Sequence, residues 1–298
     1  MFEEFKNAFQ RYNNGHVQLI IINLAVFVAM GIIMVISKFT GLEQLWSVIA
    51  EQFHIPSRFS EFVTRPWTII TYMFMHDLTS ILHILFNLLF LYWFGKLFVE
   101  YLGSDKLIAL YLLGGIAGAI LYLMAYNLIP NPPPFLTAPA GMVGASAAIF
   151  AIMVATATLL PNYTFFLLFL GPVKIKYIVG FYIFLSILYS VGDNAGGNIA
   201  HLGGALMGFI YMKQLQAGVN WGGWITVTMD WFKDLFKEKP KVKVSYRKER
   251  PTSTKPPSGE KSGYTQEEID RILDKISEGG YESLTKDEKE KLFNASKK

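Results

Sequence analysis

The chain has 298 residues, of which 52% are hydrophobic and only 17% are charged, whereas roughly 25% of the residues of a typical soluble domain are charged. It contains no cysteine, which excludes a disulfide framework, a thiolate zinc site and a cysteine nucleophile. The charged residues, with a formal net charge of +4, lie mainly near the N-terminus and after Lys233. This composition predicts a membrane protein. The basic tail favours a lipid bilayer over a nucleic acid as its partner.

Six apolar stretches approach the length of about 20 residues that a membrane-spanning helix needs. They run over residues 17–36, 81–99, 107–126, 146–160, 177–191 and 199–215, and the fourth is short. We therefore predict an all-α membrane protein with a six-helix domain over residues 17–216, preceded by a cytoplasmic segment over residues 1–16. The first stretch follows a polar start that lacks a small-residue cleavage site, so we expect a retained helix rather than a signal peptide.

Basic residues predict the orientation of these helices, because Lys and Arg concentrate on the cytoplasmic side of a membrane. The loop between the second and third stretches contains Lys106, and the loop between the fourth and fifth contains Lys174 and Lys176. The loop over residues 130–143 carries no charge. We expect a multi-pass protein of the cell (inner) membrane with both termini in the cytoplasm, which requires an even number of spans.

Three further segments follow the sixth stretch. Residues 217–238 include an amphipathic pattern, with Trp224 and Trp231 on one face, which predicts a helix lying in the membrane interface. Residues 239–263 are rich in Lys, Arg, Pro and Ser and predict a flexible basic linker. Residues 264–298 predict a small cytoplasmic helical hairpin. Its two helices begin at capping boxes, formed by Thr265 with Glu268 and by Thr285 with Glu288. Each helix carries apolar residues on one face, namely Ile269, Ile272, Leu273 and Ile276 on the first and Leu292 and Phe293 on the second.

Ser146 lies where a proline- and glycine-rich loop meets the fourth apolar stretch, on the non-cytoplasmic side. At the start of a helix, unpaired backbone N–H groups and the helix dipole favour negative charge. Gly144 permits a tight turn just before it. A nucleophilic serine placed here would have its oxyanion stabilised. The alternative is that Ser146 only caps the helix.

His201 lies early in the sixth stretch, at the same predicted depth as Ser146. Gly204 and Gly208 follow at helical spacing on one face, where small residues let two helices approach closely. If the partner is the fourth helix, His201 reaches Ser146. The alternative is a histidine bonded to a backbone carbonyl, although ionisable residues inside a membrane usually mark a functional site.

His83 and Asn87 are four residues apart and share one face of the second helix. Both can donate hydrogen bonds, so we assign them, with the backbone N–H of Ser146, to an oxyanion hole. The alternative is a pair that only holds the bundle together. Since no carboxylate suits a catalytic triad, we favour a dyad in which His201 takes the proton of Ser146.

With these motifs, residues 67 to about 212 resemble the rhomboid intramembrane serine proteases. The motifs are His83-xxx-Asn87, Gly144-Ala145-Ser146 and Ala200-His201-xx-Gly204-xxx-Gly208. The resemblance implies the bacterial six-span architecture. It also implies that Phe150, four residues after Ser146, stacks on the catalytic histidine. His76 falls near the position of an additional, nonessential histidine of the family.

The chain departs from the family at two positions. Ala147 stands where glycine is common after the nucleophile, which adds a methyl group where helices pack. Thr68 stands where many members carry an arginine after the first-loop tryptophan, here Trp67.

These observations predict a serine endopeptidase that cleaves the transmembrane segments of other proteins and needs no cofactor and no metal. The alternatives are a catalytically silent rhomboid-like protein that binds membrane helices, and a small transporter. The transporter would show internal repeats, and the sequence has no convincing one.

Overall fold

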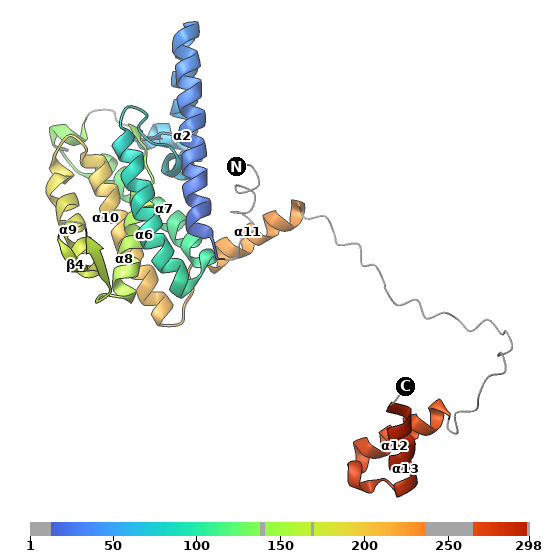
Figure 1. Cartoon of the computed structure of the whole chain (residues 1–298). Helices are drawn as coiled ribbons and strands as arrows, with labels where there is room; N and C mark the ends of the chain where they lie inside the picture. Colours follow the sequence, from blue (N-terminus) through green and yellow to red (C-terminus); the bar gives the residue numbers. More distant parts are fainter. Residues whose placement is uncertain (1–12, 138–140, 168–169, 237–264, 297–298) are drawn as a thin grey trace. The chain divides into compact units, whose positions relative to one another are not determined.

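The computed structural model describes residues 13–137, 141–167, 170–236 and 265–296. The chain divides into two compact units, Met1–Glu238 and Lys239–Lys298. Each of the six predicted apolar stretches forms a helix of the first unit (Figure 1). These helices are α2 (Gly15–Thr40), α6 (Ile81–Leu102), α7 (Ser104–Leu128), α8 (Ser146–Leu159), α9 (Ile175–Leu188) and α10 (Ala195–Gln216).

Three of these helices, α2, α6 and α7, are long and apolar enough to cross a membrane. Helices α8 and α9 are shorter apolar helices of 14 residues each. Helix α10 has 22 residues, but its glycines, Asn198 and His201 make it less apolar. A count of six spans therefore stays a prediction.

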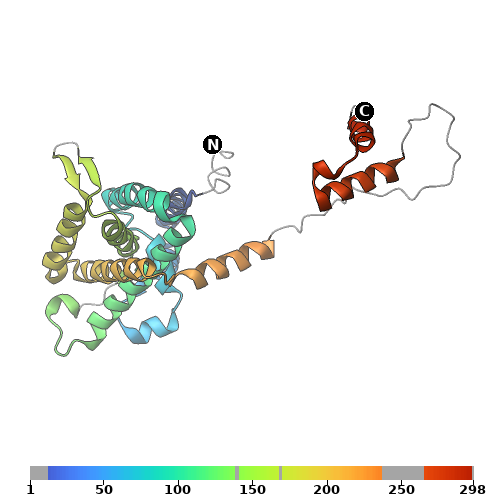
Figure 2. The same ribbon diagram turned by 90° about the horizontal axis from the view of Figure 1, so that it is seen from below.

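Helix α8 forms the centre of the first unit. Every side chain from Ala147 to Thr156 is buried. Figure 2, which looks along the bundle, shows α8 enclosed by the other helices. A helix that is apolar on all sides is either surrounded by lipid or buried in protein, and α8 is buried in protein. The element that begins with Ser146 is therefore the most completely packed helix of the bundle.

Glycines allow α10 and α7 to lie against α8. A Cβ atom built on Gly204 would overlap with the carbonyl oxygen of Ala147, and one on Gly208 would overlap with that of Ala151. Next to α10, a Cβ on Gly118 of α7 would lie 2.6 Å from the Cβ of Ala147. Close approach through small residues is the usual means of helix association in membranes.

The loops contain short helices and two pairs of strands, so the prediction of an all-α chain was wrong in this detail. Strand β1 (Ile55–Pro56) pairs antiparallel with β2 (Gly141–Met142), and β3 (Thr164–Leu167) pairs with β4 (Gly171–Lys174). Three of the four residues of β3 are β-branched or aromatic, which favours a strand once a partner is present. The short helices are α3 (Glu43–Glu51), α4 (Phe59–Thr64), α5 (Thr68–Thr71), η1 (Tyr72–Phe74), η2 (Pro134–Leu136) and η3 (Tyr189–Val191).

The first long loop is stabilised by internal contacts and is tied to the bundle by Asn127, and no sequence motif indicated these side chains. Arg65 lies 3.1 Å from a carboxylate oxygen of Glu51. Asn127 of α7 donates a hydrogen bond to the carbonyl of Ser57 and accepts one from the N–H of Phe59. Thr68 is fully buried, and its hydroxyl donates to the carbonyl of Arg65. Arg65 thus joins two parts of the loop, and this arginine stands two residues before Trp67 rather than directly after it.

The first unit ends with helix α11 (Gly223–Phe236), in which Trp224 and Trp231 are exposed. The predicted linker over residues 239–263 lies outside the described residues. The second unit contains α12 (Gln266–Gly279), η4 (Tyr281–Ser283) and α13 (Lys286–Ser296). Its predicted apolar face is only partly buried: Ile272 is buried, while Leu273 and Phe293 are about half exposed. Leu284, which lies between the helices, supplies further buried surface.

Glu288 gives the hairpin a testable pH dependence. Its carboxylate accepts hydrogen bonds from the backbone N–H and hydroxyl of Thr285 and from Lys275. The N–H bond contributes most, and together these bonds lower the pKa of Glu288 from 4.5 to about 2. A lowered pKa means that the ionised group stabilises the folded hairpin above about pH 4.5. The stabilisation is lost as the pH falls through about 2.

The measurement is an NMR titration of the side-chain carboxyl carbon of Glu288 in the full-length protein, assigned with Glu288→Gln. A midpoint near 2 is expected. A midpoint at the ordinary value of 4.5 would contradict the hydrogen-bonded geometry.

Candidate active site

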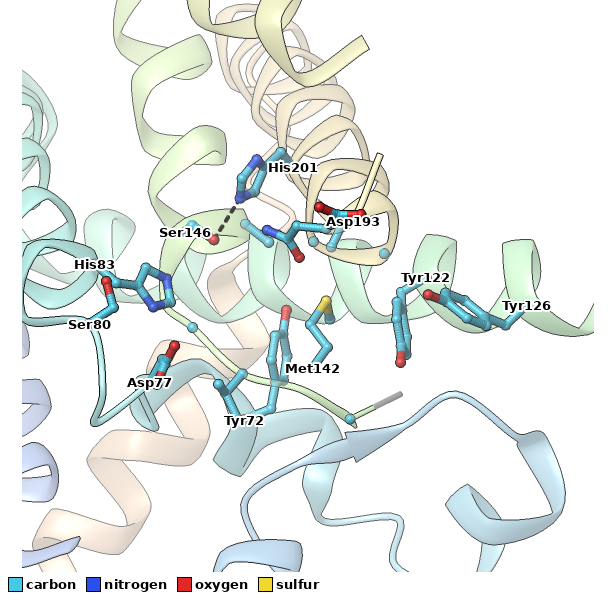
Figure 3. A pocket seen from close by; sticks show the side chains of 18 residues that line it. Tyr72, Asp77, Ser80, His83, Tyr122, Tyr126, Met142, Ser146, Asp193 and His201 are labelled. Atoms are coloured by element: carbon cyan, nitrogen blue, oxygen red, sulfur yellow. Dashed lines mark hydrogen bonds between the residues drawn. The ribbon is translucent and has the colours of Figure 1, made fainter. Parts of the chain in front are cut away.

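The hydroxyl of Ser146 faces the ring of His201. Ser146 is the first residue of α8, and its Oγ lies 2.7 Å from Nε2 of His201 on α10 (Figure 3). The N-cap residue is Ala145, and no side chain caps the helix. The alternative in which Ser146 serves only as a cap therefore does not describe this structure.

The loop before Ser146 is held in place by contacts with β1 of the first loop and with Tyr72 of η1. The pairing of β1 with β2 fixes Gly141 and Met142 against the first loop. The N–H of Gly144 donates to the carbonyl of Tyr72 over 3.0 Å. Gly144 has φ = +131°, which side-chain-bearing residues rarely adopt. A Cβ on Gly144 would lie 3.2 Å from Nε2 of His83 and 3.6 Å from Oγ of Ser146. The missing side chain thus leaves open the space that these two groups share.

Two neighbours fix the ring of His201. Phe150, one turn after Ser146 on α8, stacks on it with ring centroids 4.4 Å apart and planes 8° apart, as the resemblance implied. The second ring nitrogen, Nδ1, which does not face Ser146, lies 3.2 Å from Oγ of Ser186 on α9. Sequence reasoning missed Ser186. The only signal for it was a hydroxyl group inside an otherwise apolar stretch.

The two predicted oxyanion residues lie on the α6 side of Ser146. His83 lines the same cavity as Ser146 (Figure 3) and packs against His76 with ring centroids 5.5 Å apart. Asn87 is buried one turn further along α6, and its Nδ2 donates to the carbonyl of His83 over 2.7 Å. One N–H of Asn87 is therefore used inside the helix, and its second N–H is the one that could act on a ligand.

Two hollows meet at Ser146. The first is a cavity of about 560 Å³ with mixed walls, whose polar groups come from Tyr72, Asp77, Ser80, Tyr126 and Asp193 among others. The second is a groove of about 340 Å³ between α6, α8 and α9, with mostly apolar walls that include Phe86, Phe90, Met153 and Tyr182. Ser146, His83 and His201 line both. Water in the cavity and an apolar chain in the groove could therefore both reach the hydroxyl of Ser146. Within the described residues, no group of three or more His, Asp or Glu side chains could hold a metal ion.

Ala147, the departure from the glycine common in the family, fits without displacing Ser146. Its side chain is 2% exposed and points at Gly118 of α7. A Cβ on Gly118 would meet both this methyl group and the carbonyl of Ala200, 2.8 Å away. The glycine at position 118 therefore supplies the room that a glycine at 147 would otherwise provide.

Replacement of Phe150 by leucine is expected to reduce, about fivefold, the cleavage of a membrane substrate that the sequence predicts for the Ser146 and His201 pair. Leucine keeps an apolar contact but loses the stacked plane, which is worth roughly 1 kcal/mol. The measurement is kcat of the purified variant beside Ile152→Leu, a control at a buried position of the same helix that lines neither hollow and leaves the stacked ring pair intact. Equal rates for the Phe150 variant and the wild type would show that stacking does not hold His201.

Comparison with known proteins places this bundle in a family. The Rhomboid domain matches residues 63–216, about half of the chain, and the chain belongs to the rhomboid family. Residues 260–298 match a family of unknown function, DUF6576. The second match covers the predicted hairpin and shows that the same tail occurs in other proteins.

Two plant proteins are similar to the chain. RHOMBOID-like protein 12, mitochondrial, of Arabidopsis thaliana is 32% identical over 190 residues, which cover 60% of this chain and 56% of that protein. Rhomboid-like protein 16, chloroplastic, of the same plant is 28% identical over 211 residues, or 67% of this chain and 62% of that protein. The matches thus span less than two thirds of either relative.

Proposed function

We propose that this protein is an intramembrane serine endopeptidase that hydrolyses a peptide bond in or near the transmembrane segment of other membrane proteins. The observation that carries the proposal is the 2.7 Å contact between Ser146 Oγ and His201 Nε2. The contact lies at the N-terminus of an enclosed helix, where a hydroxyl paired with an imidazole is the arrangement of an activated serine nucleophile.

In the proposed reaction, Nε2 of His201 removes the proton of Ser146 while Oγ attacks a substrate carbonyl carbon. Negative charge then develops on the carbonyl oxygen. The backbone N–H of Ser146 and the side chains of His83 and Asn87 would donate to it, supported by the dipole of α8. His201 next protonates the leaving amine, and a water molecule hydrolyses the acyl-enzyme with His201 again acting as base.

The two hollows support a division of roles. The first cavity, which has more polar groups in its walls than the groove has, would supply the hydrolytic water, and the apolar groove beside α9 would hold the substrate chain. A helical substrate must unwind before Ser146 can reach a carbonyl. We therefore expect cleavage near residues that weaken a helix, such as glycine or proline.

The membrane arrangement belongs to the same proposal. Six spans with both termini in the cytoplasm, in the inner cell membrane, would place Ser146 near the outer surface. The three helices of spanning length and the Lys and Arg of the tail support it.

The test is co-expression with a panel of tagged single-span proteins, with wild type beside Ser146→Ala. Labelling by a fluorophosphonate, which reacts with activated serines, tests the site without a substrate. Cleavage and labelling that both disappear in the variant support the proposal. A wild-type protein that binds panel members but neither cleaves nor takes the label would instead be a catalytically silent rhomboid-like protein.

A further inference from the structure

We propose that Ser186 is a positioning residue that accepts a hydrogen bond from the Nδ1 proton of His201 and fixes the orientation of the ring. The proposal rests on the proposed function and adds a third side chain to that site. Ser186 belongs to α9, is 3% exposed, and places Oγ 3.2 Å from Nδ1 of His201. A buried hydroxyl in an apolar helix is expected to find a partner, and here the partner is the candidate base.

The first step of the argument concerns the proton. If His201 is to accept the proton of Ser146 at Nε2, its neutral ring must carry its own proton at Nδ1. That N–H then needs an acceptor in a buried place, and the Oγ of Ser186 supplies one. Removing the acceptor leaves an unsatisfied N–H and makes the wrong tautomer, with the proton at Nε2, more favourable.

The second step concerns the ring. The stacking of Phe150 fixes the plane of the imidazole but not which edge faces Ser146. Rotation of the side chain by about 180° keeps the ring in that plane and exchanges nitrogen for carbon at both contact positions. The bond at Nδ1 distinguishes the two states, so Ser186 selects the orientation in which Nε2 meets Ser146.

The third step concerns the missing carboxylate. In serine proteases with a triad, an aspartate performs both tasks and also stabilises the imidazolium ion. Among the described residues, no carboxylate is hydrogen-bonded to His201, and Asp193 lies in the cavity wall without reaching the ring. A neutral hydroxyl can accept the hydrogen bond from Nδ1 without placing a charge in the bundle, where a buried carboxylate would be unfavourable.

The kinetic test compares Ser186→Ala and Ser186→Thr with the wild type, as full-length protein in liposomes with a single-span substrate. Ser186→Ala is expected to lower kcat about tenfold with KM unchanged, because tautomer and orientation affect the reaction rather than binding. Ser186→Thr keeps the hydroxyl and is expected to recover most of the rate. The matched control is Ser190→Ala, whose hydroxyl bonds to the carbonyl of Ile187; its kcat should equal that of the wild type.

A wild-type kcat in Ser186→Ala, beside an inactive Ser146→Ala, would overturn this inference and leave the proposed function standing. Equal losses in the alanine and threonine variants would also overturn it, because they would indicate a packing role.

A second measurement does not depend on activity. ¹⁵N NMR of histidine-labelled full-length protein, assigned with His201→Ala, should show the Nδ1-protonated tautomer in the wild type and a mixture in Ser186→Ala. Identical spectra of the His201 ring in both proteins would refute the role of Ser186, even if no substrate were ever cleaved.

Discussion

Replacing Ser146 by alanine is expected to abolish cleavage of every substrate, with a loss of at least about 10³-fold in kcat. The proposed nucleophile is removed, and single losses within a serine–histidine unit have effects of that size or larger in serine proteases. The fold should be unaffected, because the hydroxyl caps no helix and its partner in the structure is His201. The measurements are cleavage of a tagged membrane substrate and fluorophosphonate labelling, with thermal unfolding in detergent as the check on folding.

A matched control is available on the same helix. Thr158→Ala removes a hydroxyl that bonds to the carbonyl of Val154 near the far end of α8. It should retain both cleavage and labelling. Residual cleavage in Ser146→Ala at a tenth of the wild-type rate or more would defeat the assignment of the nucleophile.

Replacing Gly208 by alanine is expected to destabilise the bundle strongly, although the substitution adds only one methyl group. The new Cβ would overlap with the carbonyl oxygen of Ala151, which is helix backbone and cannot rotate away. Helices α8 and α10 would have to separate. Overpacking in a closely packed core typically costs about 1–3 kcal/mol, which should appear as a clear fall in the thermal midpoint in detergent.

The control for that substitution is Gly180→Ala on α9, where a Cβ meets no atom within 4 Å. Alanine favours a helix over glycine by up to about 1 kcal/mol, so this variant should be as stable as the wild type or more so. Equal midpoints for the two variants would show that α8 and α10 do not approach as closely as the structure has them. Gly204→Ala should lower cleavage as well as stability, because Gly204 lies one turn from His201 on α10.

Much of the bundle could be predicted because membranes restrict what a chain can do. Apolar runs located all six helices to within a few residues at most ends, and the helix that begins at Gly15 continues to Thr40, beyond the predicted end. The partnership of Ser146 with His201 followed from their equal depth and from the glycines that let two helices approach. Phe150 followed only from the family resemblance.

Other features depend on tertiary pairing that no local pattern encodes. A serine such as Ser186 in an apolar stretch can bond to its own helix, face the surroundings or reach a neighbour, and only the packing of α9 on α10 decides among these. The pairing of β1 with β2 joins Ile55 to Met142, which are far apart in the sequence, so alternation within either segment could not indicate it. The compensation between Ala147 and Gly118 likewise becomes visible only when α7 and α8 lie together.

Because α8 is enclosed, substitutions of its side chains and substitutions on the outer faces of other helices have different consequences. Side chains 147–156 are all covered by protein, whereas the outward faces of α2 and α9 present Ile32, Phe39, Phe181 and Phe184 to the surroundings. Adaptation to a bilayer of different thickness or lipid content can therefore change these outward-facing residues without altering the residues that surround the hydroxyl. Such an arrangement would let one reaction centre serve in membranes of quite different composition.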